Sequence, residues 1–137
     1  MPIVVSDASP LIYLSWIGHL DLLRRLYENV MIPPSVWNEV AGLGDELPGA
    51  TEAKRAVRDG WLTIEIPAAN PEILRLAADR IDRGEIDAIS LAVERHALLI
   101  IDDLDGREIA GRVGVQVTGT LGVLSRAKQK GMLPQIR

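Results

Sequence analysis

Acidic residues follow two apolar segments that have the composition of buried strands. Asp7 closely follows residues 2–5, and Asp102 and Asp103 directly follow residues 97–101. In an open α/β sheet ligands bind at the carboxyl ends of the strands, so these side chains would converge if the two strands are neighbours. Clustered carboxylates repel one another unless a cation neutralises them. A set of oxygen ligands favours Mg²⁺ or Mn²⁺, which can activate water for phosphoryl displacement.

Helix capping is a second explanation for these aspartates, because Asp often accepts a hydrogen bond at a helix N-terminus. After Asp7, however, Ser9 is predicted as the N-cap and Pro10 as the first helical residue. Asp7 is then left without a capping role. One aspartate of the later group can cap the next helix, which leaves at least one to be explained.

Two glutamates border the apolar faces of predicted helices. At about 100° per residue, Glu39 lies about 60° from the centre of the apolar stripe of helix 35–43. Glu85 falls inside the apolar arc of helix 85–96, whereas Asp87 falls on the opposite side and is a secondary candidate. The structural alternatives are a boundary glutamate with a buried stem for Glu39 and a carboxylate that suits the helix dipole for Glu85.

Apolar runs and helical periodicity alternate along the whole chain. Besides the two clear strands, weaker strand patterns lie at 29–32, 61–66 and 115–118. The predicted helices are 10–17, 21–27, 35–43, 50–59, 71–81, 85–96, 106–113 and 121–130. This alternation predicts a doubly wound α/β fold with a parallel sheet and helices on both faces. The 137 residues contain no linker, so one domain over 1–137 is expected.

Composition excludes several functional classes. The chain has no cysteine, which rules out disulfide scaffolds, thiolate zinc sites and cysteine nucleophiles. No apolar run approaches the roughly 20 residues of a membrane span, and no signal-peptide pattern is present, so we expect a cytoplasmic protein without membrane association. Residues 1–106 carry a net charge of −9 and residues 107–137 one of +5. An acidic body with a basic C-terminal stretch argues against a general DNA-coating protein.

Five motifs follow one another along the chain. They are Asp7-Ala8-Ser9-Pro10-Leu11-Ile12; Ile32-Pro33-Pro34-Ser35-Val36 with Glu39; Gly84-Glu85 with residues 88–92; residues 99–103 with Arg107; and Val117-Thr118-Gly119-Thr120-Leu121-Gly122-Val123-Leu124. In this order and spacing they resemble the PIN-domain ribonucleases found as toxins in prokaryotic toxin–antitoxin pairs. The resemblance implies a three-layer PIN-like fold with a five-stranded parallel sheet. It also implies a homodimer and an antitoxin protein that blocks the active site.

The acidic residues of that family fall on Asp7, Glu39 and Glu85, and the fourth falls on Asp102 or Asp103. A one-residue ambiguity in the preceding strand leaves the fourth position open, and Asp102 is favoured with Asp103 beside it. The resemblance therefore implies an endoribonuclease that hydrolyses RNA with Mg²⁺ or Mn²⁺. Asp7, Glu39, Glu85 and Asp102 would be catalytic, and together with Asp103 they would bind the metal.

Weaker signals concern the substrate. Ser9, Thr118, Thr120 and Arg107 are candidates for RNA contacts, since hydroxyls and amides at a helix N-terminus suit a phosphate. A plain turn with Thr120 as N-cap explains the later threonines equally well.

On the first helix, Tyr13 and Trp16 are three residues apart and suit a dimer contact.

Other interpretations of the sequence were considered. A haloacid-dehalogenase-type phosphatase is set aside, because its motif would need Thr or Val in place of Arg107 and a longer chain after it. A receiver domain would need a second acid beside Asp7. A non-catalytic receiver-like or interaction module that binds a divalent cation is the second hypothesis, and a DNA-directed PIN nuclease is the third.

Overall fold

Five short parallel strands form one sheet in the order β3-β2-β1-β4-β5. The computed structural model describes residues 2–44 and 49–133, and the bounds below refer to these. The strands are β1 Val4–Ser6, β2 Val30–Ile32, β3 Leu62–Ile64, β4 Leu98–Ile100 and β5 Val117–Thr118. The helices are α1 Ala8–Trp16, α2 Asp21–Tyr27, α3 Pro34–Ala41, α4 Ala50–Arg58, α5 Pro71–Ala77, α6 Arg83–Arg95, α7 Leu104–Arg112 and α8 Thr120–Gln129. The predicted α/β fold with a parallel five-stranded sheet is confirmed.

Strand β1 lies at the centre of the sheet, between β2 and β4. Val5 pairs with Met31 of β2 on one side and with Leu99 of β4 on the other. Val5 and Leu99 are completely buried. Burial on both faces explains why the two clear strands are continuous apolar runs, since parallel sheets are covered by helices on each side. The two segments that end in aspartates are therefore neighbours in the sheet.

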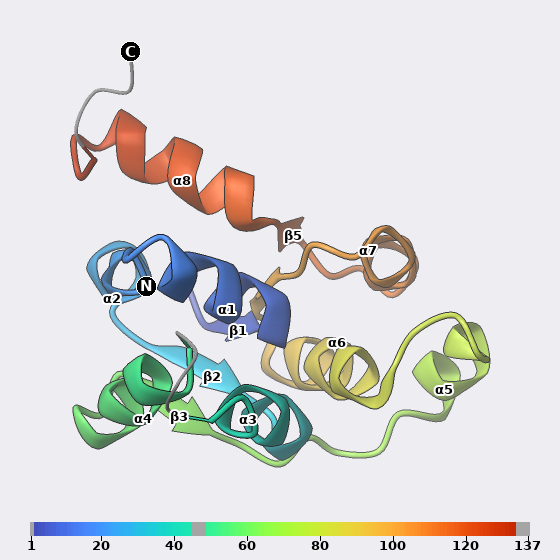
Figure 1. Ribbon diagram of the computed structural model, residues 1–137. Coiled ribbons are helices and arrows are strands. Elements are labelled where there is room, and N and C mark those ends of the chain that lie inside the picture. Colours follow the sequence, from blue (N-terminus) through green and yellow to red (C-terminus); the bar gives the residue numbers. More distant parts are fainter. Residues whose placement is uncertain (1, 45–48, 134–137) are drawn as a thin grey trace.

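The helices cover the sheet in groups that Figure 1 makes visible. Helix α8 lies beside α1 and α2, although more than 90 residues separate α8 from α2 in the sequence. Helix α3 packs against α1, α4 and α6, while α6 also contacts β1 and β4. Within the described residues, no helix is long and apolar enough to span a membrane.

Several helix boundaries differ from those expected from the sequence, and those of α1, α5 and α6 bear on the candidate site residues. Helix α1 begins at Ala8, so Asp7 and not Ser9 occupies the N-cap position. Pro10 is tolerated inside the first turn because the first amides of a helix have no intrahelical acceptor. Helix α5 ends at Ala77, since the next residue, Ala78, has φ 44°. Asp82 then caps a new helix, α6, two residues earlier than predicted.

Candidate active site

Asp7 lies at the carboxyl end of β1, where pairing with β4 continues for one more residue. The Asp7 amide donates to the carbonyl of Ile100 at 2.9 Å. The Asp7 side chain is only 6% exposed, and it makes no capping hydrogen bond to the first turn of α1 beyond the contact with the Ala8 amide. The carboxyl group is therefore held beside the end of β4 and remains available for another role.

Burial and neighbouring acids raise the pKa of Asp7 from 3.8 to about 7. Loss of hydration is the largest cause, and the amide of Ala8 partly opposes it. The remaining rise comes from repulsion by Asp82, Glu39 and Asp103. Carboxyl groups from three other segments thus surround Asp7.

Glu85 lies in the first turn of α6, with its carboxyl group aimed at the same region. Burial, the approach of the Asp103 side chain and repulsion from Asp82 and Asp7 raise the pKa of Glu85 from 4.5 to about 8. Its Oε2 atom is buried without a hydrogen-bond partner among the described residues. Such an orphaned oxygen is costly, because a buried polar atom loses its hydration without compensation.

A glycine gives the Glu85 carboxyl group its space. A Cβ atom at Gly106, in the first turn of α7, would lie 3.0 Å from Oε2 of Glu85 and 2.6 Å from Cδ1 of Ile101. Side chains larger than glycine would therefore displace Glu85, Ile101 or both. The close approach of α7 to α6 depends on this residue.

Glu39 and Asp82 meet where α3 approaches α6. Glu39 Oε1 and Asp82 Oδ1 lie 3.6 Å and 3.5 Å from the position that a Cβ atom would take at Gly84. Val36 and Val40 bury the apolar face of α3, while Glu39 beside them is exposed. Partial loss of hydration and repulsion from Asp82 nevertheless raise the pKa of Glu39.

Asp82 is the acidic residue that the sequence analysis missed. Its Oδ1 atom accepts a hydrogen bond from the Glu85 amide at 2.9 Å, which caps α6. The spacing Asp82-x-x-Glu85 is a signature of a helix N-terminus and could have identified it. Asp82 therefore fixes the turn that carries Glu85 and adds negative charge to the region.

The two adjacent aspartates after β4 have different surroundings. Asp103 caps α7 by accepting from the Gly106 amide at 2.9 Å, and its charge acts on Asp7 and Glu85. Asp102 instead accepts from the amide and the hydroxyl of Thr120. The structure thus brings Asp103 to the other acids and turns Asp102 towards α8.

The secondary acid, Asp87, lies on another side of α6. The Ser35 hydroxyl donates to Asp87 at 2.7 Å, and Nε of Arg83 lies 3.1 Å from its other oxygen. Asp87 is therefore already partnered at the start of α3. This arrangement agrees with the periodicity, which placed Glu85 and Asp87 on different faces.

A profile of the PIN domain matches residues 3–137, which is nearly the whole chain. This chain belongs to the PIN-domain family. By sequence, the PIN domain described here matches no curated protein.

Solved structures share the fold of this PIN domain at low sequence identity. A PilT N-terminus domain protein from Sulfolobus solfataricus is 17% identical, with a TM-score of 0.58 over 98% of this chain and 97% of that one. VapBC2 from Rickettsia felis, solved with a promoter DNA fragment, is 16% identical, with a TM-score of 0.55 over 85% and 98%. VapBC-1 from nontypeable Haemophilus influenzae is 14% identical, with a TM-score of 0.58 over 87% and 98%. At these identities the likeness concerns the fold alone.

The acids of this PIN domain converge without forming a finished ligand set. Among residues 2–44 and 49–133, no three His, Cys, Asp or Glu side chains are positioned to hold a metal ion as they stand. The structure places together three carboxyl groups with raised pKa values, those of Asp7, Glu39 and Glu85. The carboxyl groups of Asp82 and Asp103 lie next to them.

The candidates for RNA contacts surround the same edge of the sheet. Ser9 is half-buried in the first turn of α1, two residues after Asp7. Nη1 of Arg107 donates to the carbonyl of Ile101 at 3.5 Å. Thr118 ends β5, and Thr120 begins α8 with Gly119, not Thr120, as the N-cap residue. The N-cap role considered for Thr120 is therefore corrected.

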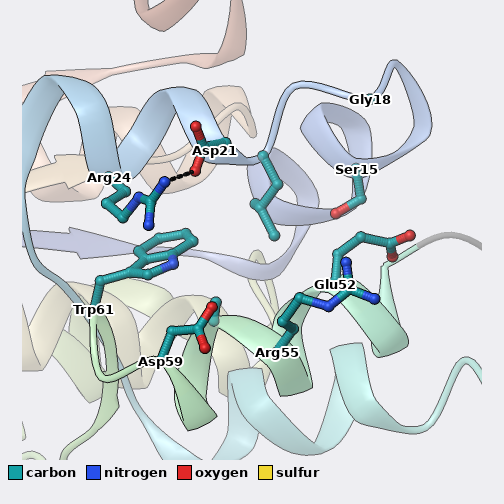
Figure 2. Close-up of a pocket in the computed structure, with 10 residues that line it drawn as sticks. Ser15, Gly18, Asp21, Arg24, Glu52, Arg55, Asp59 and Trp61 are labelled. Atoms are coloured by element: carbon teal, nitrogen blue, oxygen red, sulfur yellow. Dashed lines mark ion pairs between the residues drawn. The ribbon is translucent and has the colours of Figure 1, made fainter.

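A cavity of about 400 Å³ lies away from these acids, between the α1–α2 turn and α4. Figure 2 shows Trp61 and Asp59 on one side of it and Arg55 and Glu52 on the other. Arg24 also lines the cavity and pairs with Asp21 at 2.8 Å. None of the converging acids lines this cavity, so it is separate from the candidate active site.

Tyr13 and Trp16 form an exposed aromatic pair on α1. Their ring centroids are 5.8 Å apart in an edge-to-face arrangement, and both side chains are about half exposed. The neighbouring Ile17 is also exposed. This apolar surface is where the sequence analysis expected a contact with a second copy.

Proposed function

We propose that this PIN domain is a metal-dependent endoribonuclease that acts in the cytoplasm as the toxin of a toxin–antitoxin pair. The observation that carries the proposal is the convergence of carboxyl groups from separate elements on the carboxyl end of β1. Asp7 and Glu85 are the key members, because burial and repulsion from neighbouring carboxylates raise the pKa of both. Strongly perturbed carboxyl groups at the ligand-binding edge of an α/β sheet are typical of a functional site.

The residues present fit a hard divalent cation, Mg²⁺ or Mn²⁺. All the donors are carboxylate oxygens, which these ions prefer. Within the described part of the chain Oε2 of Glu85 has no hydrogen-bond partner, and a cation would supply one. We propose Asp7, Glu39, Glu85 and Asp103 as the residues that hold the metal. Side-chain rotations would bring their oxygens together around the ion.

A cation held by these residues would lower the pKa of a bound water and neutralise charge on a scissile phosphate. The protein residues prepare this chemistry. Asp7 and Glu85 would hold such a cation in their deprotonated form, since only the charged carboxylates are good ligands. Asp103 is oriented by its hydrogen bond from the Gly106 amide. We propose that Ser9, Arg107 and Thr118 contact the RNA, and that Thr120 lies nearby without donating to it, because its amide and hydroxyl donate to Asp102.

The basic C-terminal stretch supports a nucleic acid as the substrate. Arg112, Arg126, Lys128 and Lys130 are exposed on α7, α8 and the end of α8. Such cations attract a phosphate backbone without reading its sequence. Arg137, which belongs to the same stretch of sequence, lies outside the described residues.

A protein partner is proposed on two grounds. The fold is shared with VapBC2 and VapBC-1, and the five sequence motifs resemble toxins that bind an antitoxin. The exposed pair Tyr13 and Trp16 offers an apolar surface suited to a homodimer contact. A monomeric protein at micromolar concentration in solution would contradict the dimer.

The decisive experiment is an incubation of the purified protein with a mixed RNA pool and a matched single-stranded DNA pool. We expect cleavage of RNA with Mn²⁺ or Mg²⁺, no cleavage with EDTA and none by Asp7→Asn. Asp87→Asn is the matched control and should remain active, because Asp87 is partnered elsewhere. Metal binding without cleavage would instead favour a non-catalytic cation-binding module, and cleavage of DNA alone would favour a DNA-directed nuclease.

A further inference from the structure

Both carboxylate oxygens of Asp102 are bound to one residue on another element. Oδ1 accepts from the Thr120 amide at 2.7 Å, and Oδ2 accepts from the Thr120 hydroxyl at 2.6 Å. These lengths are those of charge-assisted hydrogen bonds, which are about twice as strong as neutral ones. Thr120 is the first residue of α8, so the bonds join the end of β4 to the start of that helix. The positive end of the helix dipole favours a carboxylate at this place.

The surroundings leave Asp102 little freedom to turn elsewhere. A Cβ atom at Gly119 would lie 2.7 Å from Oδ1 of Asp102 and 2.9 Å from Nη1 of Arg107. The absence of a side chain at Gly119 therefore lets Asp102 and Arg107 reach the backbone there. Nη1 of Arg107 also donates to the carbonyl of Ile101, the residue before Asp102, at 3.5 Å.

We propose that Asp102 is a positioning residue, which with Thr120 forms a latch that orients Asp103 from outside the metal site. Asp103 is the next residue in the chain, and it must both cap α7 and approach Glu85. A loop fixed to β5 and α8 through Thr120 can hold Asp103 in that orientation. The amide and hydroxyl hydrogens of Thr120 are both donated to Asp102, so they are not free to bind a substrate phosphate.

The latch itself is tested by unfolding, without metal and without any assay of cleavage. Asp102→Asn, Thr120→Val and the double variant form a double-mutant cycle, and Thr120→Ser is the conservative control. We expect each single variant to lower the midpoint of thermal unfolding, and the double variant to fall little further than the worse single variant. Thr120→Ser should unfold near the wild type. Additive losses, or a full loss in Thr120→Ser, would overturn the latch.

The effect on Asp103 is tested by titration with Mn²⁺, and this part rests on the proposed function. Thr120→Val removes no carboxylate, yet we expect it to weaken Mn²⁺ binding by about 10-fold, as removal of an outer-sphere partner of a metal ligand does. Thr120→Ser should restore the affinity, and Asp102→Asn should lose no more than Thr120→Val. A variant altered only in stability would keep its Mn²⁺ affinity once folded, so wild-type affinity in Thr120→Val would overturn the positioning role.

A much larger loss of Mn²⁺ affinity in Asp102→Asn than in Thr120→Val would make Asp102 a metal ligand and refute the proposal. If Asp102→Asn does not fold, the comparison of Thr120→Val with Thr120→Ser decides both parts. Failure of the wild-type protein to bind Mn²⁺ would contradict the proposed function and the positioning role alike. The unfolding cycle would still decide whether the Asp102–Thr120 latch exists, so the two failures are distinguishable.

Discussion

Replacement of Asp7 by asparagine should stabilise the metal-free protein at alkaline pH. Asp7 is buried, and its pKa in the folded protein is about 7, against 3.8 for the free side chain. One pKa unit corresponds to about 1.4 kcal/mol, so ionised Asp7 costs the folded state up to about 4 kcal/mol. Asparagine has nearly the same shape and can still accept from the Ala8 amide, but it carries no charge.

The sign of the pH dependence follows from the raised pKa. Below pH 3.8 the Asp7 carboxyl is protonated in both the folded and the unfolded chain, so it costs nothing. As the pH rises towards 7, the Asp7 carboxyl ionises in the unfolded chain but stays largely protonated in the folded protein, so the free energy of unfolding falls. Above pH 7 the cost is constant. The advantage of Asp7→Asn should therefore be small near pH 4 and grow to its full value by pH 8.

Urea unfolding in EDTA at pH 4.5, 6 and 8 measures this difference directly. We expect Asp7→Asn to be more stable than the wild type at pH 8, by an amount on the order of 2–4 kcal/mol. Asp87→Asn is the control, because it removes a charge from α6 that is already hydrogen-bonded. It should give no gain. Equal or lower stability of Asp7→Asn at pH 8, or a gain that does not vary with pH, would refute the reasoning.

Three further predictions concern the neighbours of Asp7. Glu85→Gln should also raise the stability of the metal-free protein at pH 9, where the wild-type carboxyl is charged and its Oε2 atom has no partner among the residues that the structure describes; a loss of stability in urea unfolding would contradict this. Gly106→Ala should destabilise the protein by about 1–3 kcal/mol and weaken Mn²⁺ binding, because its Cβ atom meets Ile101 and Glu85. Wild-type stability and Mn²⁺ affinity in this variant would show that the close packing is not needed. The affinity for Mn²⁺, measured by calorimetry, should rise between pH 6 and pH 9 because Asp7 and Glu85 must lose protons, and a constant affinity would argue against their role as ligands.

Much of the fold was predictable because its signals are local. Continuous apolar runs indicated β1 and β4, and helical periodicity located all the helices of the described chain to within a few residues. The same periodicity put Glu85 and Asp87 on different faces of α6. These patterns depend on a few consecutive residues and on burial, which a sequence displays directly.

The parts of the site that were not predicted depend on distant contacts. The different orientations of Asp102 and Asp103 depend on Thr120, which lies 18 residues from Asp102 along the chain and is placed by the pairing of β4 with β5. The space that Gly106 leaves for Glu85 likewise exists only where α6 and α7 meet. Neither contact has a signature in the neighbouring sequence.

A calorimetric titration of the wild-type protein with Mn²⁺ at pH 8 tests the central claim most directly. If the acids at the end of β1 hold a cation, the wild type and Asp87→Asn will show saturable binding, and Asp7→Asn will show none. Absence of binding by the wild type, or equal binding by Asp7→Asn, would contradict the claim that these carboxyl groups form a metal site.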